Sequence, residues 1–163
     1  PAFTKEGTVT AANASTINDG AAAVVLMSEA KAKALGIDPL VTVLSYADAA
    51  HEPKWFTTAP SKAIPKALKQ AGLKQENLSL IELNEAFASQ SLAVIRELDL
   101  NPEIINPNGG AISLGHPLGC TGAKLSVQLF DEMRKQQMQG KYGAVTMCVG
   151  TGQGACGIFE FLN

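Results

Sequence analysis

The alternation of apolar, β-branched runs with segments of helical periodicity most limits how this chain can fold. Strands are predicted at residues 21–27, 40–46, 78–83, 143–148 and 155–161, and helices at 28–35, 63–71, 85–98 and 121–138. Helices that fall between strands pack on the faces of a sheet, as in α/β proteins. The last two strands flank the glycine turn VGTGQG, which predicts an antiparallel hairpin. We therefore expect an α/β fold with a mixed five-stranded sheet and helices on both faces.

Local signals mark where these elements begin and end. Ser28 is a favourable N-cap for the first helix, and Gly36 is a favourable residue just beyond its end. Pro65 fits the second helix only in its first turn, where a missing N–H has no intrahelical partner. The pair Asp38-Pro39 interrupts the chain and is the best internal boundary.

Composition excludes several classes of protein. The 163 residues are 46% hydrophobic with a formal net charge of −2, too apolar for a disordered chain and too weakly charged for a nucleic-acid surface. No apolar run approaches the about 18 residues of a membrane helix. Three cysteines without CxxC spacing indicate neither a disulfide scaffold nor a zinc site. We expect a cytoplasmic domain with no metal and no nucleic-acid or membrane partner.

Glycine is concentrated in the last third of the chain. Eleven of the fifteen glycines lie between residues 109 and 157, which indicates close backbone approach to a ligand or tight chain reversal. His116 lies there, on the loop GGAISLGHPLGCTG before the longest predicted helix. The positive end of that helix dipole disfavours imidazolium, so His116 is expected to be neutral and fit to act as a general base. The alternative is a solvent-exposed loop histidine.

Two more polar residues follow predicted strands. Asn84 lies where a strand ends and a helix begins, at the rim where α/β sheets bind ligands, although an N-cap role explains it as well. Cys148 opens a glycine turn, which would expose its sulfur, although a buried structural cysteine fits the same pattern. A neutral histidine, a cysteine and an asparagine together activate a thiol and stabilise an oxyanion. This combination indicates acyl transfer.

Three other residues are weaker candidates for a catalytic role. Cys156 lies in the middle of a predicted strand and is expected to serve packing. Cys120 lies at a predicted helix start, where reactive thiols occur, but no base is near it in sequence. His51 is expected on an ordinary surface loop. No phosphate loop or dinucleotide fingerprint is present.

Three motifs follow one another along the chain: NEAFA at 84–88, GGAISLGHPLGCTGA at 109–123 and CVGTGQG at 148–154. In this order they resemble the motifs of the thiolases, the family of acetyl-CoA acetyltransferases and 3-ketoacyl-CoA thiolases. The opening GTVTAANASTINDGAAAVVLMS is also similar. The resemblance implies a thiolase-like layered fold and acyl transfer between acyl-CoA and CoA. The reaction is either Claisen condensation of two acetyl-CoA molecules or thiolysis of a 3-ketoacyl-CoA. A coenzyme A thioester is then the substrate, with no tightly bound cofactor.

The resemblance also implies roles for the motif residues. His116 matches the histidine that deprotonates the nucleophilic cysteine and helps to form one oxyanion hole, in which Asn84 holds a water. Cys148 matches the second catalytic cysteine, which moves a proton to or from the α-carbon. Gly150 contributes its N–H to the other oxyanion hole.

Substrate contacts are implied in the same way. Ser15 matches a serine that contacts the pantetheine arm, with Ala11 and Ala86 nearby. Phe56 and Phe87 would line the acyl end of the pocket. The family has a glycine-rich GxGP where this chain has Phe56-Thr57-Thr58-Ala59-Pro60.

The resemblance further implies a fragment. Residues 1–38 would be the end of the CoA-binding loop region and an N-terminal domain remnant, and 39–163 the thiolase C-terminal domain. The acyl-accepting cysteine would lie in a missing N-terminal half, so we expect the isolated chain to be inactive. The face that would pack on that missing half would be bare, so we also expect homo-oligomers. One alternative, a ketosynthase-like condensing enzyme, is disfavoured by Cys148. The other is a non-catalytic thiolase-fold module for binding or association, which predicts decay of a motif.

Overall fold

A mixed four-stranded sheet forms the centre of the computed structural model, which describes residues 1–163. Its strands are β1 (Val41–Ala50), β2 (Leu78–Leu83), β3 (Tyr142–Cys148) and β4 (Gln153–Phe161), in the order β1-β4-β3-β2. β2 and β3 run parallel, whereas β4 pairs antiparallel with both β3 and β1. The predicted hairpin between the last two strands and the mixed α/β class are confirmed.

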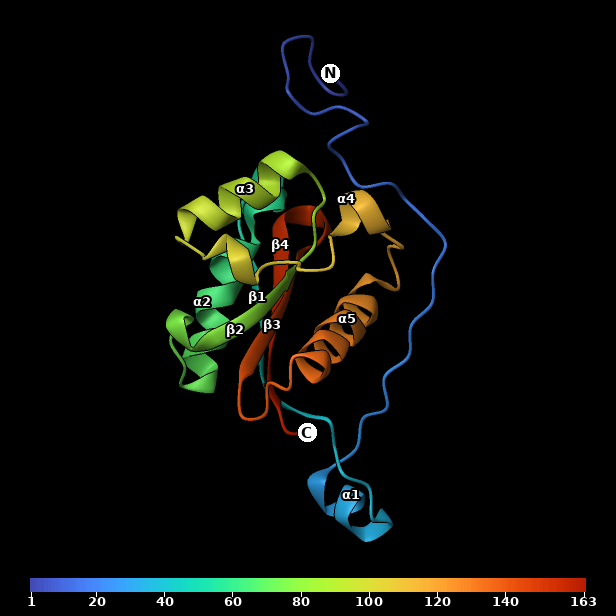
Figure 1. Ribbon diagram of the computed structural model, residues 1–163. Helices are drawn as coiled ribbons and strands as arrows, with labels where there is room; N and C mark the ends of the chain where they lie inside the picture. The colour runs from blue at the N-terminus through green and yellow to red at the C-terminus, as the bar shows by residue number, and fades with distance from the viewer.

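Helices cover both faces of the sheet (Figure 1). α2 (Pro60–Ala71) and α3 (Ala88–Glu97) lie on one face, and α5 (Thr121–Lys135) lies on the other. Side chains alternate along β2, so Ile81 packs into the core under α2 and α3 while Leu80 packs under α5. The expected helices on both faces are therefore confirmed.

The remaining helical elements are short. They are α1 (Glu29–Leu35), α4 (Ala111–Leu114), and the 3-10 turns η1 (Pro53–Thr58), η2 (Gln75–Asn77), η3 (Pro102–Ile104) and η4 (Gly150–Gly152). The predicted caps of α1 are confirmed, because the Ser28 side chain accepts from the N–H of Lys31 and Gly36 adopts φ 64°. No helix combines the length and the apolar character that crossing a membrane requires.

The strand predicted at 21–27 is wrong, and the sheet has four strands rather than five. An apolar run becomes a strand only where a neighbour accepts its backbone hydrogen bonds. This segment instead runs outside α5 toward α1, away from the sheet (Figure 1). Its side chains are exposed, with Val25 at 84% and Leu26 at 76%.

Two helix starts also differ from prediction. α2 begins at Pro60, so Pro65 lies beyond the first turn, on the exposed side of the helix. Its missing N–H leaves only the Ser61 carbonyl without a helical donor. α3 begins at Ala88 rather than Glu85, because residues 84–87 are held by the N-terminal segment: the N–H of Ser15 donates to the carbonyl of Ala86 over 3.0 Å.

Candidate functional site

The carboxyl ends of the parallel strands β2 and β3 place two predicted site residues at one edge of the sheet. Asn84 directly follows β2, and Cys148 is the last residue of β3. The N–H of Asn84 continues the ladder by donating to the carbonyl of Thr146 over 3.0 Å. This is the edge at which α/β proteins bind ligands.

A glycine-rich loop brings His116 to the same edge. Its start is fixed by the N–H of Asn106, which donates to the carbonyl of Ile81 over 2.9 Å. Its middle is fixed to the residue after Asn84, because the N–H of Ile112 donates to Oε2 of Glu85 over 3.2 Å. At its end the N–H of His116 donates to the carbonyl of Thr16 over 2.9 Å.

The His116 ring has a defined tautomer. Its Nδ1 lies 2.6 Å from Oγ1 of Thr121, and that hydroxyl donates its one hydrogen to the carbonyl of Pro117 over 3.0 Å. With that hydrogen given to Pro117, the hydroxyl oxygen accepts from His116, which assigns the proton to Nδ1 and leaves Nε2 as the basic nitrogen. This arrangement suits a general base.

Burial lowers the pKa of His116, and the positive charge of Lys124 lowers it further. The Nζ of Lys124 donates to the carbonyl of Gly115, one residue before the histidine, over 2.9 Å. The lowered pKa agrees with the neutral histidine expected from the sequence. The two causes are burial and the charge of Lys124.

Asn84 is fully buried, at 0% exposure, and it is not an N-cap, because Phe87 occupies that position of α3. Neither Oδ1 nor Nδ2 of its side chain hydrogen-bonds another group of the chain. Buried amides of folded proteins are nearly always paired. The Asn84 amide is thus a donor and an acceptor held ready for a group from outside the chain.

Of the two alternatives that the sequence left open for Cys148, the structure shows the buried one. Cys148 is 8% exposed, and burial raises the pKa of its thiol. A raised pKa keeps the group protonated near neutral pH, as a proton donor requires. Cys156 is also buried, and burial raises its pKa to about 12, so the packing role predicted for it is confirmed.

The turn that follows Cys148 is strained. Thr151 has φ 65° and Gly152 has φ 92°, a region that a β-branched residue rarely adopts and that marks functional turns. Gly150 opens this turn, η4, and N–H groups in the first turn of a helix lack intrahelical partners.

Residue His51 holds the same turn. Its N–H donates to the carbonyl of Gly152 over 3.0 Å, and a Cβ on Gly152 would overlap its carbonyl oxygen. The side chain of His51 is half-buried with Nε2 enclosed. His51 therefore lies on a loop, as predicted, but its ring is partly enclosed rather than free on the surface.

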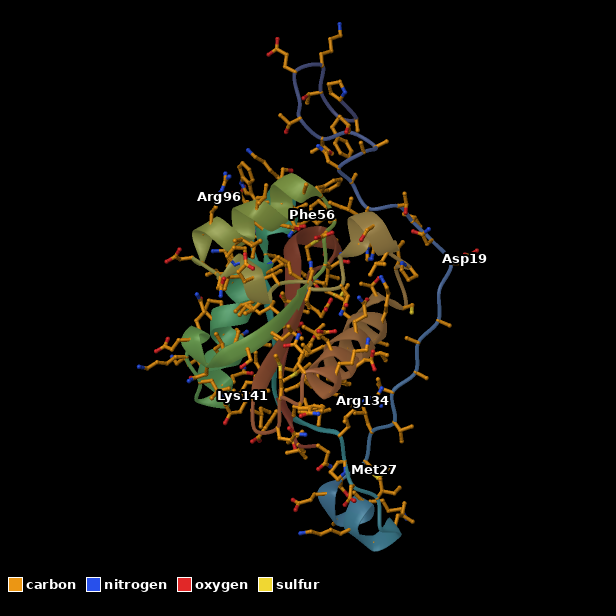
Figure 2. The ribbon with its side chains drawn as sticks, in the orientation of Figure 1. Asp19, Met27, Phe56, Arg96, Arg134 and Lys141 are labelled. Atoms are coloured by element: carbon orange, nitrogen blue, oxygen red, sulfur yellow. The ribbon has the colours of Figure 1, made fainter.

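The predicted substrate-side residues fall into two groups. Ser15 is joined to Ala86, since both its N–H and its hydroxyl donate to the Ala86 carbonyl over 3.0 and 3.2 Å. The next pair, Ala14 and Phe87, forms an antiparallel bridge. Ala11 is exposed at the start of this segment. Phe56 lies in η1, at the end of the sheet where β4 begins (Figure 2).

A buried carboxyl lies two residues before Asn84. Glu82 of β2 is fully buried, and neither of its oxygens has a hydrogen-bond partner in the chain. Burial raises its pKa to about 7, although the positive charge of Lys124 acts in the opposite direction. Glu82, Thr121 and Lys124 are site residues that were not predicted from the sequence. Thr121 could have been predicted, because it is a hydroxyl residue at the start of a helix, five residues after His116.

The chain matches two thiolase family models, "Thiolase, C-terminal domain" over residues 37–161 and "Thiolase, N-terminal domain" over residues 1–30. It is 55% identical to the 3-ketoacyl-CoA thiolase of Bacillus subtilis, over 98% of this chain and 40% of that protein. It is 46% identical to the human peroxisomal 3-ketoacyl-CoA thiolase, over 99% of this chain and 38% of that protein.

Solved structures agree with these sequence matches. The Bacillus anthracis acetyl-CoA acetyltransferase superimposes with a TM-score of 0.96 at 46% identity, covering 99% of this chain and 41% of that one. The dimeric peroxisomal thiolase of Saccharomyces cerevisiae gives a TM-score of 0.93 at 40% identity, covering 99% and 40%. The chain thus spans about two fifths of the length of the relatives it matches. Because the C-terminal family model alone covers most of its residues, this chain belongs to the thiolase family.

Proposed function

We propose that this chain supplies the base and the proton carrier of a thiolase that transfers acyl groups between coenzyme A thioesters. The observation that carries the proposal is the His116 ring, whose Nδ1 lies 2.6 Å from the Thr121 hydroxyl and whose pKa burial lowers. It lies on the loop anchored beside Asn84, at the edge where β3 ends in Cys148. Relatives that are 48–55% identical to this chain are named acetyl-CoA acetyltransferases and 3-ketoacyl-CoA thiolases.

In the first half of the proposed reaction, Nε2 of His116 takes the proton of a cysteine thiol contributed from outside these 163 residues. The resulting thiolate attacks the carbonyl carbon of the acyl-CoA, a carbon–sulfur bond forms, and coenzyme A leaves as a thiolate that takes up the proton. The Asn84 amide, directly or through water, and His116 stabilise the negative oxygen of one intermediate.

In the second half, the Cys148 thiol first passes its proton to Nε2 of His116 and then, as a thiolate, removes a proton from the α-carbon of a second acyl-CoA. The carbanion attacks the acyl-enzyme carbonyl, and the enzyme cysteine leaves as a thiolate that takes the proton back from His116. In thiolysis the direction reverses, and the protonated Cys148 thiol donates its proton to the α-carbon. The raised pKa of Cys148 favours this donor state, and the N–H of Gly150 would stabilise the developing oxyanion.

The substrate side follows from the same proposal. Ser15, Ala11 and Ala86 would contact the pantetheine arm, while Phe56 and Phe87 would line the acyl end. Residues 1–38 would form the end of the CoA-binding region and 39–163 the C-terminal domain. No tightly bound cofactor is required, since proton transfer and thioester exchange suffice.

Assembly and location are also proposals. A homo-oligomer is supported by the similarity to the Saccharomyces cerevisiae peroxisomal thiolase, which is described as dimeric. Relatives are described as cytosolic, peroxisomal and mitochondrial. Of these, we propose a cytoplasmic location.

A chimera tests the proposed activity. This chain replaces the matching two fifths of the Bacillus subtilis thiolase, at 55% identity, and acetoacetyl-CoA thiolysis is measured. We expect the chimera to retain activity within about tenfold of its parent, and the isolated 163-residue chain to show no turnover. A folded but inactive chimera would instead favour a non-catalytic module, and turnover by the isolated chain would contradict the need for an outside cysteine.

A further inference from the structure

Glu85 joins the segment that carries Asn84 to the loop that carries His116. Its Oε2 accepts a hydrogen bond from the N–H of Ile112 over 3.2 Å, and its Oε1 accepts one from Nδ2 of Asn106 over 3.3 Å. Hydrogen bonds to an ionised carboxylate are about twice as strong as those between neutral groups. One side chain thus holds both the start and the middle of the loop.

The side chain of Asn106 fixes the start of this loop by pairing with the backbone of β2, as the backbone of a neighbouring strand would. Its Oδ1 accepts from the N–H of Leu83 and its Nδ2 donates to the Leu83 carbonyl, both over 2.8 Å. Its backbone has φ 48°, a conformation that asparagine tolerates better than most residues. Asn106 therefore presents its amide to β2 and to Glu85 at the same time.

Gly110 makes room for the Glu85 carboxylate. A Cβ on Gly110 would overlap the carboxylate of Glu85, although its φ of −107° is open to any residue. The glycine is therefore required for space rather than for backbone conformation. The carboxylate is inserted into the loop at this point.

We propose that Glu85 is a positioning residue, which fixes the His116 loop relative to Asn84 through Ile112, Asn106 and the space at Gly110. The proposal rests on the proposed function for the identity of the groups that are positioned. Glu85 acts through the loop backbone and takes no part in proton transfer. Loss of its two hydrogen bonds would therefore release the loop without removing a reacting group.

Glu85→Gln tests the proposal in the 163-residue chain. Glutamine keeps the shape but has one oxygen, so either the Ile112 N–H or Nδ2 of Asn106 must face an NH₂ group. We expect hydrogen exchange of the Ile112 amide to accelerate by about tenfold or more, and the ring NMR signals of His116 to shift. His51, the other of two histidines, is the internal reference, and exposed Glu97→Gln is the matched control that changes neither signal.

A second set of variants separates positioning from general destabilisation. Gly110→Ala alone should displace the loop, because the new methyl group collides with the carboxylate. In the E85A background the same methyl group has room, so Gly110→Ala should perturb His116 much less there. Equal effects of Gly110→Ala in both backgrounds would overturn the proposal.

Two further outcomes are decisive. Unchanged Ile112 exchange and unchanged His116 signals in E85Q would overturn the positioning role, as would acceleration spread equally over the amides of β2 and β3. In an active chimera, E85Q should lower kcat more than it changes KM. If the chimera is inactive while E85Q still releases Ile112 and shifts His116, the proposed function fails and the structural coupling stands.

Discussion

The imidazole Nδ1 of His116 lies 2.6 Å from the hydroxyl oxygen of Thr121, the first residue of α5. Because that hydroxyl donates to the Pro117 carbonyl, the contact fixes which ring nitrogen is basic. The helix start thus determines the chemistry of a loop residue. Thr121 is fully buried, whereas the His116 ring is half-buried.

Thr121→Val should release the His116 tautomer, because valine keeps the shape of threonine and removes the acceptor. We expect ¹⁵N chemical shifts of the ring to show a mixture of Nδ1-H and Nε2-H forms in place of one. In an active chimera, kcat should fall by about a hundredfold. Thr121→Ser keeps the hydroxyl and serves as the control. A single, unchanged tautomer in the valine variant would show that Thr121 does not set it.

Lys124→Met should raise the pKa of His116 toward the ordinary histidine value, because it removes the positive charge that lowers it. An NMR titration of the ring protons measures this directly, with His51 as the internal reference. Lys135→Met, at the far end of α5, should leave the titration unchanged. An unchanged or lower pKa of His116 in K124M would contradict the electrostatic role of Lys124.

Glu82 should make the protein less stable as the pH rises. Its pKa is raised from 4.5 to about 7 in the folded state, so the folded protein binds more protons than the unfolded chain between these values. The free energy of unfolding should therefore fall from pH 4.5 to 7, by up to about 3 kcal/mol, and stay low above pH 7. Urea unfolding at about pH 5 and about pH 8 measures the difference.

Glu82→Gln supplies the control for that measurement. The variant cannot ionise, so most of the fall in stability between the two pH values should disappear. The exposed variant Glu97→Gln should keep the fall of the parent chain. A pH dependence that is identical in E82Q and the parent would assign it to other groups.

Gly152→Ala should destabilise the turn after Cys148. The residue has φ 92°, and a Cβ would overlap the carbonyl oxygen of His51. We expect a loss of about 2–4 kcal/mol in the free energy of unfolding. Gly119→Ala, where the added methyl group meets nothing, should cost less than about 1 kcal/mol. Equal stability of the two variants would contradict the strain assigned to Gly152.

The strands of the sheet and the main helices followed from periodicity because burial acts on each element directly. The hairpin of β3 and β4 and the caps at Ser28 and Gly36 are local features, and they were predicted correctly. Residues 21–27 have the same apolar signal as a strand, but strand formation depends on a partner that local sequence does not reveal. The start of α3 was displaced for a related reason, since Ser15 holds residue 86 from more than seventy positions away.

The candidate site could also be predicted only where local sequence carries the information. Asn84, His116 and Cys148 were found because each lies at the end of an element or in a glycine-rich loop. Glu82 and Lys124 were missed because their effects depend on burial and on contacts between β2 and α5. The burial of Cys148 stayed open from sequence, because the glycine turn that follows favours exposure, whereas its position at the end of β3, paired with Gly154 of β4, buries it.

The most direct test of the account is acetoacetyl-CoA thiolysis by the chimera with His116→Ala and, separately, Cys148→Ala. The control is Cys120→Ser, which lies at the start of α5 outside the proposed machinery. If His116 is the base and Cys148 the proton carrier, each alanine variant should lose about a thousandfold in kcat while remaining folded, and C120S should keep the parent rate. Alanine variants that keep near-parent activity would contradict both roles.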